Sequence, residues 1–272
     1  EHRLVRMAAA RTLHQLDGDQ AAPILLEDIR GNDYDMVLVA DAALAHWKYD
    51  AAAEVWMRRL EDLSAPRAVV VSAIESLAIA QITHAASTLV EIAIDRSVEK
   101  ALRLSAAIAV AALQSSDLEV DATQMQNGTL PDRLVAATLI STHQSETAQQ
   151  LMLTMSVDPD PAVAAIALRR LLEIDPLLIT PLSAQLIVHP DPNVRQLTAQ
   201  SLVSQASTQA VTLLGPRLDD VNPDLRLFVR NNLIQLSKRS DLTQSVLEQA
   251  VGMLSGDRWR GLEQAAIVLG RL

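Results

Sequence analysis

The chain has 272 residues, of which 49% are hydrophobic but only 2% aromatic, so its apolar side chains are almost all Ala, Leu, Val, Ile and Met. This composition is typical of helices and excludes a disordered or low-complexity chain. A net charge of -10 argues against a general affinity for nucleic acid, and the absence of cysteine excludes disulfides, thiolate zinc sites and a cysteine nucleophile.

A unit of about 32 residues recurs along the whole chain. Each unit begins with an apolar residue, often followed by Arg, and continues with small apolar residues, a polar break and a second apolar stretch. The starting residues are Val5, Val37, Val69, Leu102, Leu134, Val163, Val194, Leu225 and Trp259. An internal repeat of this length predicts units that stack in a row.

Two helices are predicted in each unit. The first half of a unit has the spacing of an amphipathic helix, as in 102–113 and 163–174, and the second half repeats that period after a polar turn, as in 210–218 and 242–254. We therefore expect an all-α fold of about eight to nine antiparallel helical hairpins. They form one repeat domain over residues 1–272, a right-handed α-solenoid (superhelix) with a concave and a convex surface. Because a helical pattern is still running at Gly270-Arg271-Leu272, we expect the chain to be part of a longer protein.

Prolines mark the helix starts. In 160–161, 191–192 and 222–223, an Asp or Asn precedes a Pro, which places a capping acceptor before a residue whose missing N–H costs nothing at the first helical position. We predict that Asp160, Asp191 and Asn222 are helix caps. Pro181, Gly215 and Pro216 fall inside second helices and should shorten or kink them.

The segment Asp191-Pro192-Asn193-Val194-Arg195, followed by a small-residue helix, resembles HEAT repeats. The short unit is similar to the bacterial subgroup named after phycobilisome lyases, and the resemblance covers essentially the whole chain. It implies an ARM-like superhelix that binds other proteins, and it specifies function poorly because the family includes scaffolds, adaptors and a few enzymes.

A recurrent arginine follows the starting residue of several units and lies near the Asp of the preceding turn. The resemblance implies that these arginines form a ladder of charge-assisted contacts between adjacent units, with a phosphate-binding row as the alternative. The ladder residues are Arg6, Arg103, Arg195, Arg226 and Arg260.

No sequence motif of catalysis is present, and the six histidines are too far apart in sequence to share a helix face as metal ligands. The paired His-Glu dipeptides with which deoxyhypusine hydroxylases hold iron are also absent. Acidic residues gather at 27–35 and 219–224, where turn and cap roles are favoured over calcium binding. We therefore predict no cofactor, no metal and no enzymatic activity.

Four of the six aromatic residues lie between positions 34 and 56, followed by two arginines. Trp, Tyr and Arg dominate binding hot spots, so this segment is the candidate partner site, while packing between hairpins is the alternative. If the segment is a site, Trp56 and Arg59, on the second helix of their hairpin, should face the groove. The candidate residues are Tyr34, Trp47, Tyr49, Trp56, Arg58 and Arg59.

The sequence favours an interaction scaffold whose concave surface binds a protein or peptide. Residues 1–136 hold most of the net negative charge, which predicts a basic or amphipathic partner there. No membrane span is predicted, and end-to-end self-association is expected to be possible. The alternatives are a lyase-like or chaperone-like protein that attaches linear tetrapyrroles, by fold analogy, and a structural spacer.

Overall fold

The computed structural model describes residues 2–114 and 116–272, and within them it contains 17 α-helices, short 3-10 segments and no β-strand. The predicted all-α fold is confirmed. The structure forms two compact units, residues 1–145 (unit 1) and residues 146–272 (unit 2). A single repeat domain over residues 1–272 stays a prediction.

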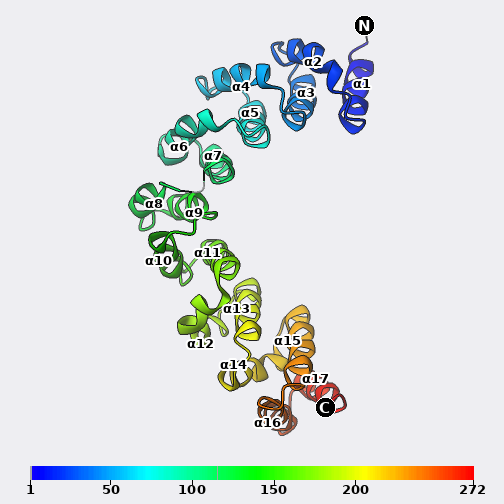
Figure 1. Ribbon diagram of the computed structural model, residues 1–272, viewed down its shortest axis with the longest axis vertical. Helices are drawn as coiled ribbons and strands as arrows, with labels where there is room; N and C mark the ends of the chain where they lie inside the picture. Colours follow the sequence, from blue (N-terminus) through cyan, green and yellow to red (C-terminus); the bar gives the residue numbers. More distant parts are fainter. Residues whose placement is uncertain (1, 115) are drawn as a thin grey trace. The chain divides into compact units, whose positions relative to one another are not determined.

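Unit 1 is a row of helical hairpins in two layers. Within this row α1, α3, α5 and α7 lie side by side on the inner side of its bend, and α2, α4 and α6 lie on the outer side (Figure 1). The helices are α1 (Arg3–Gln15), α2 (Ala22–Ile29), α3 (Tyr34–His46), α4 (Ala53–Leu60), α5 (Arg67–Ile79), α6 (Ala86–Ile94), α7 (Lys100–Leu113), α8 (Glu119–Met125) and α9 (Leu130–Leu139).

Unit 2 repeats the same arrangement. Its first helices α11, α13 and α15 form one layer, and α10, α12, α14 and α16 form the other (Figure 1). The helices are α10 (Glu146–Met155), α11 (Pro161–Ile174), α12 (Ser183–Leu186), α13 (Pro192–Gln205), α14 (Thr208–Leu214), α15 (Pro223–Leu236), α16 (Thr243–Leu254) and α17 (Trp259–Leu269).

The three proline-marked helices begin at the proline, and the residue before it holds the first turn. Asp160 Oδ1 accepts from Ala162 N at 2.9 Å. Asp191 Oδ1 accepts from the backbone N–H groups two and three residues later at 2.8 and 3.2 Å. Asn222 Oδ1 does the same at 2.9 and 3.0 Å. Each cap satisfies N–H groups that have no partner inside the helix.

Proline and glycine shorten two second helices of unit 2, as the sequence predicted. Pro181 lies in the 3-10 segment Pro176–Leu182, and the α-helix that follows has only four residues. Gly215 and Pro216 open the 3-10 segment Gly215–Asp219, where α14 ends. Proline has no backbone N–H to donate to the α-helical hydrogen-bond ladder, so the chain forms 3-10 turns at these points.

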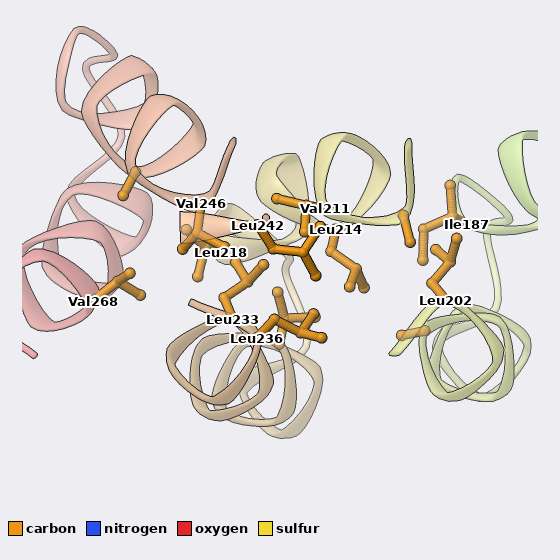
Figure 2. Close-up of a cluster of buried hydrophobic side chains, with 14 of the residues drawn as sticks. Ile187, Leu202, Val211, Leu214, Leu218, Leu233, Leu236, Leu242, Val246 and Val268 are labelled. Carbon is orange, nitrogen blue, oxygen red and sulfur yellow. The ribbon is translucent and has the colours of Figure 1, made fainter. Parts of the chain in front are cut away.

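The hydrophobic core lies between the two layers of each unit and passes from one hairpin to the next. Figure 2 shows Leu202, Leu214, Leu233 and Val246, from four helices of unit 2, in one buried cluster. Each hairpin therefore completes its core with its neighbours, and no single central nucleus is needed.

The tight turns inside several hairpins place a non-glycine residue in the left-handed region. These residues are Asp17 (φ 51), Lys48 (φ 52), Gln81 (φ 62), Asp117 (φ 66) and Ala206 (φ 44). These five turns therefore share a left-handed residue between the two helices of the hairpin, whereas the turn at Asp175 (φ -160) is extended. For a residue with a Cβ this conformation costs about 1 kcal/mol or more.

Candidate functional site

The aromatic residues of the predicted site do not form one cluster. Tyr34 is the first residue of α3 and is 50% exposed. Trp47 follows the last residue of α3, and Tyr49 lies in the turn after it; both are half-buried. Because a helix of 13 residues is roughly 20 Å long, Tyr34 lies at the opposite edge of unit 1 from the other two.

Trp56 is packed inside unit 1. Its side chain is 0% exposed, and its indole Nε1 donates to Asp41 Oδ1 at 2.8 Å. Helix α4 lies in the outer layer of unit 1 (Figure 1). Because the Trp56 side chain is fully buried, it does not face a groove, contrary to what we expected if this segment were a site. Of the two interpretations of the aromatic segment, a partner site or packing between hairpins, packing applies to Trp56.

Asp41 is the centre of a buried polar network that the sequence analysis missed. The Arg59 Nη1 and Ser72 Oγ donors lie 2.6 and 2.8 Å from Asp41 Oδ2. Arg59 Nη2 also donates to the carbonyl of Ile29 at 2.6 Å. These residues belong to α2, α3, α4 and α5, so one carboxylate and one guanidinium tie three successive hairpins together.

Three of the predicted site residues, Tyr34, Arg58 and Arg59, line one surface depression of about 430 Å³. We call it the Tyr34 depression. Ile29, Val37, Val55 and Val69 give it apolar walls, and the rest of its lining is Arg30, Gly31, Asp62 and Ala65. The depression lies where the turns between the first three hairpins meet α4. We call this edge of unit 1, where successive hairpins are joined, the turn edge.

Two of the three arginines that line the Tyr34 depression, Arg30 and Arg58, pair with exposed carboxylates. Arg58 pairs with Glu54 at 2.7 Å and Arg30 with Glu27 at 2.6 Å, and all four side chains are at least half exposed. Exposed pairs of this kind contribute little to stability, so either arginine can exchange its carboxylate for one on a partner. Hydrogen bonds from the side chain and backbone of Ser64 lower the pKa of Asp62, which therefore stays ionised at neutral pH.

Two of the predicted ladder arginines are buried between hairpins. Arg103 Nη2 donates to Asp132 Oδ1 at 2.6 Å, and its Nε donates to the carbonyl of Ala93 at 3.0 Å. Burial raises the pKa of Asp132, but hydrogen bonds from Arg103 and Thr129 and the charge of Arg103 outweigh it and lower that pKa to about 2. The carboxylate is therefore ionised and fully occupied by donors.

Arg195 repeats this arrangement in unit 2. Its Nε and Nη2 form a bidentate contact with the Asp220 carboxylate at 2.9 and 2.6 Å. Its Nη1 donates to the carbonyls of His189 and Pro190. The carbonyls belong to the preceding turn but the carboxylate belongs to the following one. Arg103 differs in detail, because Ala93 lies in α6 and Asp132 lies in the first turn of α9. Both arginines connect their helix to the hairpin that follows, and a ladder along the whole chain stays a prediction.

The other three predicted ladder residues make different contacts. Arg6 lies 3.8 Å from Asp28, and Arg260 lies 3.6 Å from Asp219. Arg226 Nη1 donates to the carbonyls of Asp220 and Val221 at 2.6 and 3.2 Å. The arginines therefore join turns to helices by several different contacts along the chain.

The two acidic segments are engaged by neighbouring donors. Asp33 caps α3 and accepts from Arg3 Nε at 2.6 Å, and the same arginine contacts Asp35. The hydrogen bond from Arg3 lowers the pKa of Asp33 to about 2. In the second segment Asp220 is held by Arg195. Among the residues that the structure describes, no three His, Asp or Glu side chains are placed to hold a metal ion together.

Comparison with known proteins shows no family for this chain. No family model and no curated protein matches the chain. Similar solved structures include an engineered protein (16% identity, 97% of this chain and 84% of that chain, TM-score 0.48). The complex of CpcE and CpcF of phycocyanin lyase from Nostoc sp. PCC7120 has 14% identity over 92% of this chain and 94% of that chain, with a TM-score of 0.47. Human deoxyhypusine hydroxylase has 14% identity over 96% and 98%, with a TM-score of 0.41.

The lyase and the hydroxylase are both HEAT-like helical-repeat proteins, and this likeness concerns the fold alone. The prediction of no enzymatic activity needs correction, because the similar structures include two enzymes. The absence of known catalytic motifs was too weak a basis for it. No helix in the described part of the chain has the length and apolarity that crossing a bilayer requires.

Proposed function

We propose that this chain binds a segment of a protein partner, and that the Tyr34 depression receives an apolar side chain of that segment with acidic residues on either side of it. The observation that carries the proposal is that the exposed residues Tyr34 and Arg58 line the same depression of about 430 Å³, together with apolar side chains. Tyrosine and arginine contribute large contact areas together with polar groups, and binding hot spots are enriched in both.

The local charge favours an acidic segment although unit 1 as a whole is acidic. Among the described residues, Arg30, Arg58 and Arg59 line the depression together with one carboxylate, that of Asp62. Asp41 neutralises Arg59, but Arg30 and Arg58 are paired only with the exposed Glu27 and Glu54. Because such exposed pairs are weak, these two arginines can turn to acidic groups of a partner. The basic partner predicted from the overall charge of residues 1–136 would instead suit surfaces outside this depression.

We infer further that the units are of the short bacterial HEAT type. The support is the repeat length, together with helices that begin after Asp191 and Asn222 in the same way. The concave layer of first helices stays the expected surface for a large partner, and the Tyr34 depression on the turn edge would add a specific anchor to it.

The test is a random dodecapeptide display library selected against the chain, followed by fluorescence polarisation with the enriched peptides. Enriched sequences should contain an apolar residue among Asp and Glu. Tyr34→Ala and Arg58→Glu should each weaken binding at least tenfold. Arg11→Glu, which reverses an exposed charge on α1 of the same unit, is the matched control and should change binding less than twofold. Arg59 is left intact because it belongs to the buried network.

Enrichment of basic sequences would contradict the proposal. So would equal losses from Arg11→Glu and Arg58→Glu, because the effect would then come from the overall charge and not from the depression.

A further inference from the structure

A second surface groove lies in unit 2, between the N-terminal halves of the first helices α13 and α15. It has a volume of about 560 Å³. Most of its polar lining consists of side-chain amides, and Asp224 is its only charged lining residue among those described. The lining residues are Pro192, Asn193, Gln196, Asn222, Asp224, Leu227, Phe228 and Asn231.

The amides of this groove have unused hydrogen-bonding capacity. Within the described residues, the side chains of Asn193 and Gln196 make no hydrogen bond to the protein. The Asn222 oxygen is occupied by the α15 cap and the Asn231 oxygen accepts from Arg230 Nε at 3.2 Å, but the NH₂ groups of both remain available. The groove therefore offers four NH₂ donors and two amide oxygens.

This pattern fits a ligand that carries alternating donors and acceptors without charge. The main chain of an extended peptide does so, with one N–H and one C=O for each residue. Leu227, which is 46% exposed, and the half-buried Phe228 provide apolar surface beside the amides. Residues 137–272 carry almost balanced charge, so no strong field selects for a charged ligand there.

We propose that the α13–α15 groove binds the main chain of an extended, uncharged peptide segment. Side-chain amides hold its N–H and C=O groups, and Leu227 contacts an apolar side chain. This site is separate from the Tyr34 depression and differs from it in the chemistry that it recognises. Either proposal can therefore fail while the other holds.

The test is a two-dimensional NMR titration of the whole chain, labelled with ¹⁵N, with acetyl-(Thr-Ala)₃-amide as the probe. The side-chain NH₂ signals of Gln196 and Asn231 should shift in a saturable manner. The same peptide methylated on every backbone nitrogen should leave them in place, because it has lost its donors and its steric fit.

Gln196→Met and Asn231→Leu preserve side-chain size and remove the amide, and each should weaken the apparent affinity at least threefold. Gln200→Met, on the exposed surface of α13 outside the groove, is the matched control and should bind as the unchanged chain does. Equal thermal midpoints of all variants would show that folding is intact.

Three results would overturn the proposal. The probe peptide leaves the amide signals unmoved, the methylated peptide binds equally well, or methyl α-glucoside moves the same signals while the peptide does not. The last result would assign the groove to sugar hydroxyls, which amides also recognise.

Discussion

The indole N–H of Trp56 donates to the carboxylate of Asp41 at 2.8 Å, with both side chains fully buried. The same carboxylate accepts from Arg59, which reaches back to the first hairpin through the carbonyl of Ile29. An aromatic residue that resembles a binding hot spot in the sequence is therefore part of the junction between hairpins. The exposed part of the predicted site is reduced to Tyr34 and Arg58.

Removing the Asp41 carboxylate should destabilise unit 1 strongly. Asp41→Ala leaves Arg59, whose side chain is only 13% exposed, without its counter-charge, and we expect a loss of about 3–5 kcal/mol in the free energy of unfolding. Urea denaturation followed by circular dichroism measures it. The double variant Asp41→Ala, Arg59→Met should recover part of the loss, because the unpaired buried charge is gone. A double variant as unstable as the single one would contradict this explanation.

Replacing Arg195 with lysine should destabilise unit 2. Arg195→Lys keeps the charge but loses the bidentate contact with Asp220 and the hydrogen bonds to the carbonyls of His189 and Pro190. We expect a loss of roughly 1–3 kcal/mol in unit 2, measured by denaturant unfolding. Arg239→Lys, at an exposed pair with Asp241, should change stability little. Similar losses for the two variants would show that the geometry of the Asp220 contact is unimportant.

The stability of unit 1 should fall in acid as Asp132 takes up a proton. Its pKa is about 2 in the folded chain against 3.8 ordinarily, so the ionised form favours folding. The contribution, at most about 2 kcal/mol, is complete well above pH 4 and disappears as the pH falls from about 4 towards 2. Unfolding free energies of the unchanged chain and of Asp132→Asn across this range test it. The variant should be less stable near neutral pH and lose less between pH 4 and 2. Parallel curves would contradict the assignment.

Two glycines of the last helices should respond oppositely to alanine. Gly252 lies inside α16, and a Cβ added there would have no other atom within 4 Å, so Gly252→Ala should stabilise by up to about 1 kcal/mol through helix propensity. A Cβ on Gly261 would lie 2.5 Å from Met253 Sδ and 3.0 Å from Asp219 Cβ. Gly261→Ala should therefore cost roughly 1–3 kcal/mol by overpacking. Thermal unfolding of both variants checks the difference in sign, and stabilisation by both would show that α17 packs less closely.

Glycine at position 206 should stabilise the turn after α13. Ala206 is the C-cap in the left-handed region, with φ 44 and ψ 50, which glycine adopts without a steric cost. Ala206→Gly is expected to gain about 0.5–1 kcal/mol. Ala266→Gly, on the exposed face of α17, should lose about 1 kcal/mol instead and serves as the control in the same melting experiment.

Local signals in the sequence were sufficient for the fold. A capping side chain before a proline acts within one helical turn, so the starts at Pro161, Pro192 and Pro223 were predictable without tertiary information. The apolar period likewise depends on each helix alone.

The candidate site was predictable only in part, because it depends on which way each helix is rotated in its layer. Tyr34, Arg58 and Arg59 share one depression, whereas Trp47 and Tyr49 lie at the other edge and Trp56 points inward. One signal was present and overlooked, since Asp41 is an acidic residue in the middle of an otherwise apolar helix face. A buried carboxylate needs donors, and the following helix carries two side chains able to supply them, Trp56 and Arg59.

The side-chain hydrogen bonds that Asp41 accepts join residues no more than 31 positions apart in the chain. Contacts of such short range cost little loop-closure entropy, so folding need not await the distant end of the polypeptide. As the chain leaves the ribosome, each new hairpin can pack against the one before it. The hydrogen bond from Ser72 to Asp41 can form as soon as α5 emerges.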